Sequence, residues 1–189
     1  MSADPHPWAR TLEGLHAQAW ARLGRGVHDR HATARHPTLA TVSAEGRPQA
    51  RTVVLRGVER GSATLQVYTD LQSAKVAELR ASPFAAVHVW DSGAHLQIRL
   101  QAEVTILSGV ASAAIWAQLP QHGRSAYGSA PAPGAPVPAA LDYSKTPDPS
   151  AFAILSLAVT EVDLLHLGTD HRRARFRRAS GWSGEWLVP

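Results

Sequence analysis

The fold is decided by residues 68–75, "YTDLQSAK", because the chain changes there from a strand pattern to a helix pattern. The preceding run, "ATLQVYT" at residues 63–69, alternates apolar and polar side chains, which is typical of a half-buried β-strand. Ser73 then precedes "AKVAELRA", where it is suited to cap a short helix that ends before Pro83. The sequence therefore predicts a strand, a tight turn and a helix over residues 63–82.

The start of this helix carries groups that bind phosphate. Unpaired N–H groups and the positive end of the helix dipole lie at a helix N-terminus. Ser73 and Lys75 add a hydroxyl and a positive charge there, and Thr69 adds a second hydroxyl just before the turn. Tyr68 either contacts a planar ring or packs. The alternative is an ordinary capped helix with a solvated lysine.

Strand-like runs dominate the rest of the chain, and short turns join most of them. They cover residues 38–44, 49–59, 84–91, 95–107, 151–167, 173–179 and 184–189. Helical spacing appears over about residues 8–30 and again over residues 111–120. The Pro-rich stretch from about residue 128 to 149 shows no period and predicts a loop. We expect a single domain over residues 1–189, a mainly β antiparallel barrel with peripheral helices.

Composition narrows the classes of function. A chain of 189 residues with 44% hydrophobic content can bury a real core. The absence of Cys excludes disulfides, a thiolate nucleophile and Cys-based metal sites. No apolar run of about 18 residues appears, and the first residues lack the pattern of a secretory signal. We therefore expect a cytoplasmic protein that does not enter the membrane, and its formal net charge of +4 suits anionic ligands.

Residues 171–178, "HRRARFRR", concentrate five Arg in eight positions. Such a run either binds nucleic acid or forms a strand whose alternate Arg point one way. His28, His31 and His36 lie near a helix end without an evident carboxylate second shell, so we expect no metal site. The chain also lacks a Gly-x-Gly-x-x-Gly loop, a Walker loop and a Gly-x-Ser-x-Gly elbow.

Two further segments place polar residues on strand-like runs. Arg51 and Arg56 flank a β-branched run in "RTVVLRG". Arginine binds phosphate bidentately, and the backbone of such a strand can hydrogen-bond the edge of a planar ring. In "HLQIRLQ", Gln97, Arg99 and Gln101 share one side of a strand. The alternatives are arginines that emerge into water and a solvent-facing glutamine.

Taken in this order, the three segments resemble the pyridoxamine 5'-phosphate oxidase family, which are FMN-binding flavoproteins with a split β-barrel. The family carries an Arg-x-Val-Leu-Leu-Lys-like strand, then Tyr-Thr followed by Ser-Arg-Lys at a helix start, and later Arg-Gln-Val-Arg on a strand. The matching residues here are 51–56, 68–69, 73–75 and 96–99, and the resemblance covers roughly residues 36–108.

The resemblance implies a homodimer with FMN at the interface between the two copies. It implies that Arg51, Ser73 and Lys75 hold the FMN phosphate and that Gln97 reaches the isoalloxazine ring. The backbone of Thr52, Val53, Val54 and Leu55, together with Arg56, Tyr68 and Thr69, would line the cofactor. Arg175 would be a further FMN contact from the C-terminal part, and Arg56 would serve both FMN and an anionic substrate.

The sequence also departs from the family pattern. Ala74 stands where the family usually has Arg, Gln121 takes an Arg position for the substrate phosphate, and Leu165 replaces a usual Trp. These departures favour a related FMN-dependent oxidoreductase acting on an unidentified small substrate over pyridoxamine phosphate oxidation itself. No side chain is predicted to act as acid or base. The alternatives are a non-catalytic, haem-binding or deazaflavin-binding split barrel and, after these, a basic nucleic-acid-binding module.

Overall fold

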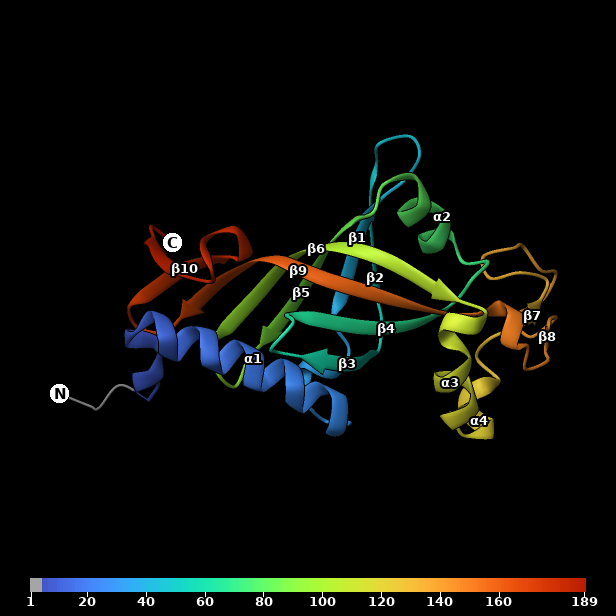
Figure 1. Ribbon diagram of the computed structural model, residues 1–189, viewed down its shortest axis with the longest axis horizontal. Helices are drawn as coiled ribbons and strands as arrows, with labels where there is room; N and C mark the ends of the chain where they lie inside the picture. The colour runs from blue at the N-terminus through green and yellow to red at the C-terminus, as the bar shows by residue number, and fades with distance from the viewer. Residues whose placement is uncertain (1–4) are drawn as a thin grey trace.

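The computed structural model describes residues 5–189, and its centre is a nine-stranded antiparallel sheet (Figure 1). The strands lie side by side in the order β11-β10-β9-β6-β5-β1-β2, while β4 pairs with both β9 and β3. Their bounds are β1 Thr38–Val42, β2 Pro48–Thr52, β3 Leu55–Glu59, β4 Thr64–Asp70, β5 Phe84–Asp91, β6 Leu96–Ser108, β9 Phe152–Leu167, β10 His171–Arg177 and β11 Gly184–Leu187. The mainly β, antiparallel architecture predicted from the sequence is confirmed.

The longest strand, β9, organises the sheet. Its first half pairs with β4 on one side, its second half pairs with β10, and β6 runs along its other side for almost the whole length. Two groups of strands therefore share β9. The end of β4 consequently lies level with the start of β9, where Thr69 pairs with Ala153.

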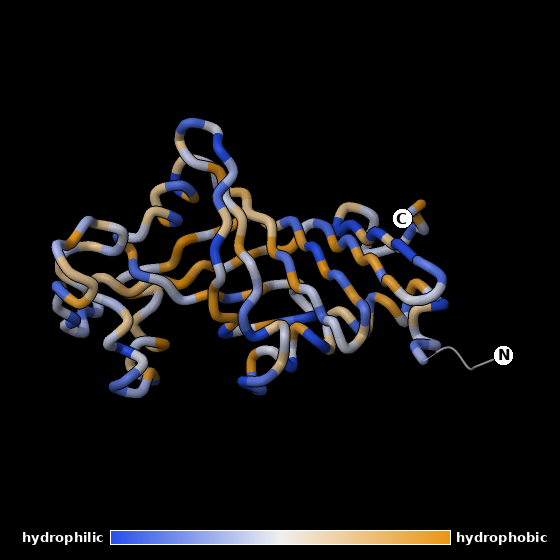
Figure 2. Tube along the Cα trace, turned by 180° about the vertical axis from the view of Figure 1, so that it is seen from behind, coloured by the Kyte–Doolittle hydropathy of each residue, from blue (hydrophilic) through white to orange (hydrophobic). Residues whose placement is uncertain are grey.

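Alternation along the strands separates a buried face from an outer face. In β6, Leu96, Ile98 and Leu100 are buried, whereas Gln97 and Arg99 point to the other side, as the sequence predicts. Figure 2 shows hydrophobic and hydrophilic positions alternating along these strands. The buried face packs against the apolar side of the N-terminal helix α1.

Helix α1 lies against the buried face of the sheet, and the shorter helices lie around its edges (Figure 1). They are η1 Pro7–Arg10, α1 Leu12–His28, η2 Thr33–Arg35, α2 Ala74–Ala81, α3 Val110–Gln118, α4 Gln121–Arg124, η3 Pro149–Ala151 and η4 Arg178–Ser180. The segment predicted as one helix over about residues 8–30 is a 3-10 turn followed by α1, because the Thr11 hydroxyl accepts the Gly14 N–H and starts a new helix. No helix among residues 5–189 is both long and apolar enough to cross a membrane.

Three further sequence-based predictions need correction. The strand predicted over residues 173–179 is β10 His171–Arg177, because residues 178–180 form the 3-10 turn η4. The strand predicted over residues 49–59 is two strands, which separate at Val53 and Val54 because β2 pairs with β1 while β3 pairs with β4. The Pro-rich stretch from about 128 to 149 is not entirely loop, because β7 Ser129–Ala130 and β8 Ser144–Lys145 form a short hairpin. This hairpin lies with α3 and α4 at the end of the molecule away from the N-terminus (Figure 1).

A second, smaller core holds this end of the molecule to the sheet. Phe152 is completely buried. The centre of its ring lies 5.4 Å from the ring centre of Tyr68, 4.9 Å from that of Tyr127 and 5.4 Å from that of Trp116. Ile154 completes the buried cluster. Strand β4, helix α3 and the segment after α4 thus meet on one aromatic side chain.

Candidate functional site

The turn between β4 and α2 is fixed by Asp70. Its buried carboxylate accepts the N–H of Gln72 at 2.8 Å and the N–H of Gly128 at 2.9 Å. Its backbone carbonyl accepts the hydroxyl of Ser73 at 2.7 Å. Ser73 is the N-cap residue of α2 as predicted, but its hydroxyl donates backward to the turn and does not cap its own helix. The α2 N-terminus is therefore held in place by the turn before it.

Polar side chains gather at this N-terminus. The hydroxyls of Thr69 and Ser73, both buried, lie 3.1 Å apart, and the Lys75 ammonium donates to Thr69 Oγ1 at 3.0 Å. Burial lowers the pKa of Lys75, the positive charge of Arg51 lowers it further, and Asp70 and Glu78 oppose both effects. A lysine held against hydroxyls, with its charge disfavoured by burial and by a second cation, is well suited to an anionic ligand.

Arg51 reaches the same place from β2. Its Nη2 donates to Glu78 Oε2 at 2.8 Å, and its Nη1 donates to the hydroxyl of Thr41. The structure thus brings Arg51, Thr69, Ser73 and Lys75 together at the start of α2, and we call these four residues the basic cluster. Two cations, two hydroxyls and a helix N-terminus are the groups that bind a phosphate monoester.

Residues 52–55 link β2 to β3 beside the basic cluster. Thr52 is exposed, Val54 is partly buried, and Val53 and Leu55 point into the core. The Val53 N–H donates to the carbonyl of Pro37 at 3.0 Å. The sequence predicts a continuous strand here, but the chain leaves one pairing partner and joins another at this point.

Arg56 follows this link, and Tyr68 and Tyr127 lie near it. The Arg56 guanidinium is 6.0 Å from the centre of the Tyr68 ring. Burial raises the pKa of Tyr68 and of Tyr127, although the positive charge of Arg56 acts in the opposite direction on both. Both hydroxyls therefore stay protonated at neutral pH and are available as donors beside a cation. Tyr127 was not predicted from the sequence, because only its packing on Phe152 brings it here.

Gln97 and Arg175 are not brought to the basic cluster within one chain. Gln97 pairs with Leu165 of β9 and Thr69 pairs with Ala153, so twelve residues of β9 separate the two levels. At about 3.3 Å per residue this is about 40 Å along the strand. Gln97 lies on the outer face, opposite the buried Leu96 and Ile98.

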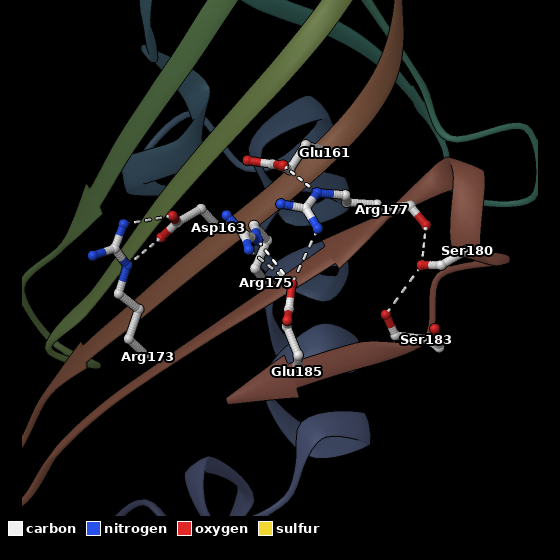
Figure 3. A network of polar contacts seen from close by, with 8 residues as sticks. All are labelled: Glu161, Asp163, Arg173, Arg175, Arg177, Ser180, Ser183 and Glu185. Carbon is white, nitrogen blue, oxygen red and sulfur yellow. Dashed lines mark hydrogen bonds and ion pairs between the residues drawn. The ribbon is translucent and has the colours of Figure 1, made fainter. Parts of the chain in front are cut away.

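Arg175 is held in a network of ion pairs on β9, β10 and β11 (Figure 3). Its Nε and Nη2 both donate to Glu185 Oε1, at 3.1 and 2.9 Å, and Arg177 shares the same carboxylate. The alternate arginines of the Arg-rich run point one way, as one of the two interpretations predicts, and carboxylates neutralise them. This neutralisation weighs against nucleic-acid binding.

A cavity of about 360 Å³ lies elsewhere, between α1, the following loop and β5. Its charged side chains are already paired, Arg22 with Asp91 at 2.9 Å and Arg25 with Asp29 at 2.8 Å. We therefore place the candidate site at the basic cluster on chemical grounds. Among residues 5–189, no group of three or more His, Asp or Glu side chains is arranged to hold a metal ion.

Comparisons with known proteins bear on this site. A family model described as "Pyridoxamine 5'-phosphate oxidase, FMN-binding domain" matches residues 6–108, which contain the whole basic cluster. Pyridoxine/pyridoxamine 5'-phosphate oxidase 2 of Arabidopsis thaliana is 30% identical over 200 residues, which cover 93% of this chain and 100% of that protein. A Pseudomonas putida pyridoxine/pyridoxamine 5'-phosphate oxidase is 36% identical over 87 residues, and the match spans only 40% of its length.

Solved structures share the fold. A pyridoxamine 5'-phosphate oxidase-related FMN-binding protein of Nostoc punctiforme superposes with a TM-score of 0.74 at 28% identity, covering 97% of both chains. PhzG of Burkholderia lata superposes with a TM-score of 0.66 at 19% identity, covering 98% of this chain and 94% of its own. The nine-stranded sheet is therefore the split-barrel arrangement of these proteins.

Proposed function

This chain belongs to the pyridoxamine 5'-phosphate oxidase family of FMN-binding domains, and from this premise we propose that it binds FMN non-covalently and acts as an oxidoreductase on a small substrate. The observation that carries the proposal is the basic cluster. Arg51 and Lys75 supply positive charge, Thr69 and Ser73 supply hydroxyls, and α2 supplies its N-terminus, so the donor set fits the phosphate of FMN.

The flavin ring has a place beside this cluster. The link at residues 52–55 runs from Arg51 toward Arg56 and Tyr68, and it offers backbone groups between two strands to the edge of a planar ring. When bound, FMN supplies hydride transfer, which no side chain of this chain provides. The protein's own part is to orient the cofactor through the phosphate and the backbone at residues 52–55 and to exclude water with its apolar side chains.

We propose that a second copy of the chain completes the site. Gln97 lies twelve residues of β9 away from the level of Thr69, and Arg175, which pairs with Asp163, lies ten residues away. Both are too far along the sheet to join the basic cluster of their own chain, so they serve a flavin held by the partner. The outer face that carries Gln97 also exposes Phe84 and Trp90, at 64% and 38%. Trp90 lies directly opposite Gln97, and Phe84 lies six residues away on the same face of β5. Exposed apolar side chains on one face of a sheet are a common feature of an interface between protein copies.

Arg56, Tyr68 and Tyr127 favour an anionic substrate. They place one positive charge and two protonated hydroxyls next to the segment that would face the ring. A carboxylate or phosphate on a small molecule is the partner that these donors fit. The position of Arg56 in this group supports its double role toward cofactor and substrate.

Anaerobic reduction of the FMN-loaded protein tests the oxidoreductase proposal. The visible absorbance of oxidised flavin is followed after mixing with pyridoxamine 5'-phosphate, pyridoxine 5'-phosphate, NADPH or a panel of small carboxylated amines. The proposal is supported if one of these compounds bleaches the flavin, if the bleaching is slower in Arg56→Ala, and if the admission of oxygen restores the absorbance. Retained FMN that nothing in the panel bleaches contradicts the oxidoreductase part and leaves a flavin-binding protein.

A further inference from the structure

We propose that Glu78 and Thr41 are positioning residues that aim Arg51 at the phosphate of the bound flavin. The inference rests on the proposed FMN binding and assigns a role to two residues outside the basic cluster. Neither residue touches the phosphate in this scheme. Both act through the guanidinium of Arg51.

The geometry around Arg51 carries the inference. Glu78 Oε2 accepts Nη2 of Arg51 at 2.8 Å, the Thr41 hydroxyl accepts Nη1, and the same hydroxyl donates to Glu78 Oε2. The three side chains thus form a closed triangle of hydrogen bonds. Thr41 is buried, and the side chains of Arg51 and Glu78 are only 23% and 11% exposed. A guanidinium held at two of its nitrogens and mostly out of water keeps one orientation.

The location of Glu78 links this triangle to the phosphate site. Glu78 lies three residues after Lys75 on α2, so the two side chains share a face of the helix. One short helix therefore carries Ser73 and Lys75 at its start and the anchor for Arg51 one turn later. This arrangement fixes the distance between the two cations. An arginine already ordered in this way loses less side-chain entropy when the ligand binds.

A carboxylate next to a phosphate site also has a cost. The charge of Glu78 opposes the positive charges of Arg51 and Lys75, and it weakens their attraction for an anion. In this proposal, the gain from a fixed orientation of the Arg51 guanidinium is larger than the loss of attraction caused by the negative charge of Glu78. The two effects separate in two variants, because Glu78→Gln keeps an oxygen that accepts from Arg51 but removes the negative charge, whereas Glu78→Ala removes both.

The test compares dissociation constants for FMN and for riboflavin, which lacks the phosphate, by titration of flavin fluorescence. Glu78→Ala is expected to weaken FMN binding by about tenfold and leave riboflavin binding unchanged. Glu78→Gln is expected to bind FMN at least as tightly as wild type, and Thr41→Val is expected to weaken FMN selectively by a few-fold. Glu13→Ala, which removes an exposed carboxylate on α1, is the matched control and is expected to change neither constant.

The possible failures are distinguishable. Wild-type FMN affinity in Glu78→Ala, or an equal loss for FMN and riboflavin, overturns the positioning role while FMN binding stands. Loss of FMN affinity in Glu78→Gln as large as in Glu78→Ala overturns it as well. A wild-type protein that binds riboflavin as tightly as FMN overturns the phosphate site itself, and this inference with it. Thermal melting of each variant identifies any that fails to fold. If Glu78→Ala does not fold, Thr41→Val carries the test: a selective few-fold loss of FMN affinity supports the positioning role, and wild-type FMN affinity or an equal loss for riboflavin overturns it.

Discussion

Replacing Lys75 with methionine tests the phosphate site at the group whose environment is best defined. The Lys75 ammonium donates to Thr69 Oγ1 at 3.0 Å, and it is partly buried at the start of α2. Methionine keeps the length and the apolar part of the side chain and removes the charge. A charge-assisted hydrogen bond between an ammonium and a phosphate contributes about 1.5–3 kcal/mol. Its loss corresponds to a rise of about 10- to 150-fold in the dissociation constant for FMN.

The assay is titration of the ligand-free protein with FMN and with riboflavin at constant ionic strength. Riboflavin affinity is expected to stay within about twofold in Lys75→Met, since only the phosphate contact is lost. Lys75→Arg, which retains the charge, is the matched control and is expected to recover most of the affinity. FMN binding by Lys75→Met within twofold of wild type, or a parallel loss for riboflavin, would refute the assignment of Lys75 to the phosphate.

Three further predictions concern the supports of the site. Burial lowers the pKa of Lys75 in the folded protein below its ordinary 10.5, so the unfolded chain holds this proton more firmly. The ligand-free wild type therefore gains stability relative to Lys75→Met as the pH rises toward 10.5. Urea unfolding of both proteins at neutral pH and at pH ~10 measures this gain, and an unchanged difference contradicts it. Phe152→Ala lowers the free energy of unfolding by about 3–5 kcal/mol, because three aromatic rings pack on this buried ring. Phe152→Leu is expected to lower it by clearly less, and equal losses for the two variants in urea titrations speak against the packing argument. Asp70→Ala removes the acceptor of the Gly128 N–H, costs about 1–3 kcal/mol and opens the Pro-rich segment to trypsin. An unchanged digestion pattern counts against that tie.

Much of the fold follows from local pattern. The alternation at residues 63–69 and 95–107 correctly predicts strands and assigns the outward side of Gln97. The separation of β2 from β3 does not follow, because "TVVL" has the pattern of an uninterrupted strand. The break arises from pairing with two strands that are distant in the sequence, β1 and β4. Pairing between distant segments leaves no mark in a short window of sequence.

The candidate site also combines residues whose proximity follows from local sequence with residues that only tertiary structure brings near. Thr69, Ser73 and Lys75 lie in one turn and helix start, so their proximity follows from the sequence alone. Arg51 joins them through tertiary structure, and its anchor Glu78 was not predicted because an acidic residue on an exposed-looking helix carries no local signal. The proposed role of Arg175 toward a partner's flavin could not be tested within one chain, where its charge is paired with Glu185 (Figure 3).

The visible absorption spectrum tests the central claim most directly. Purified protein is mixed with FMN, desalted and measured beside a variant that carries Arg51→Ala and Lys75→Ala. We predict a flavin spectrum retained by the wild type at one FMN per chain and lost by the variant. A wild type that elutes colourless, or a variant that retains FMN as well as wild type does, would contradict FMN binding at the basic cluster.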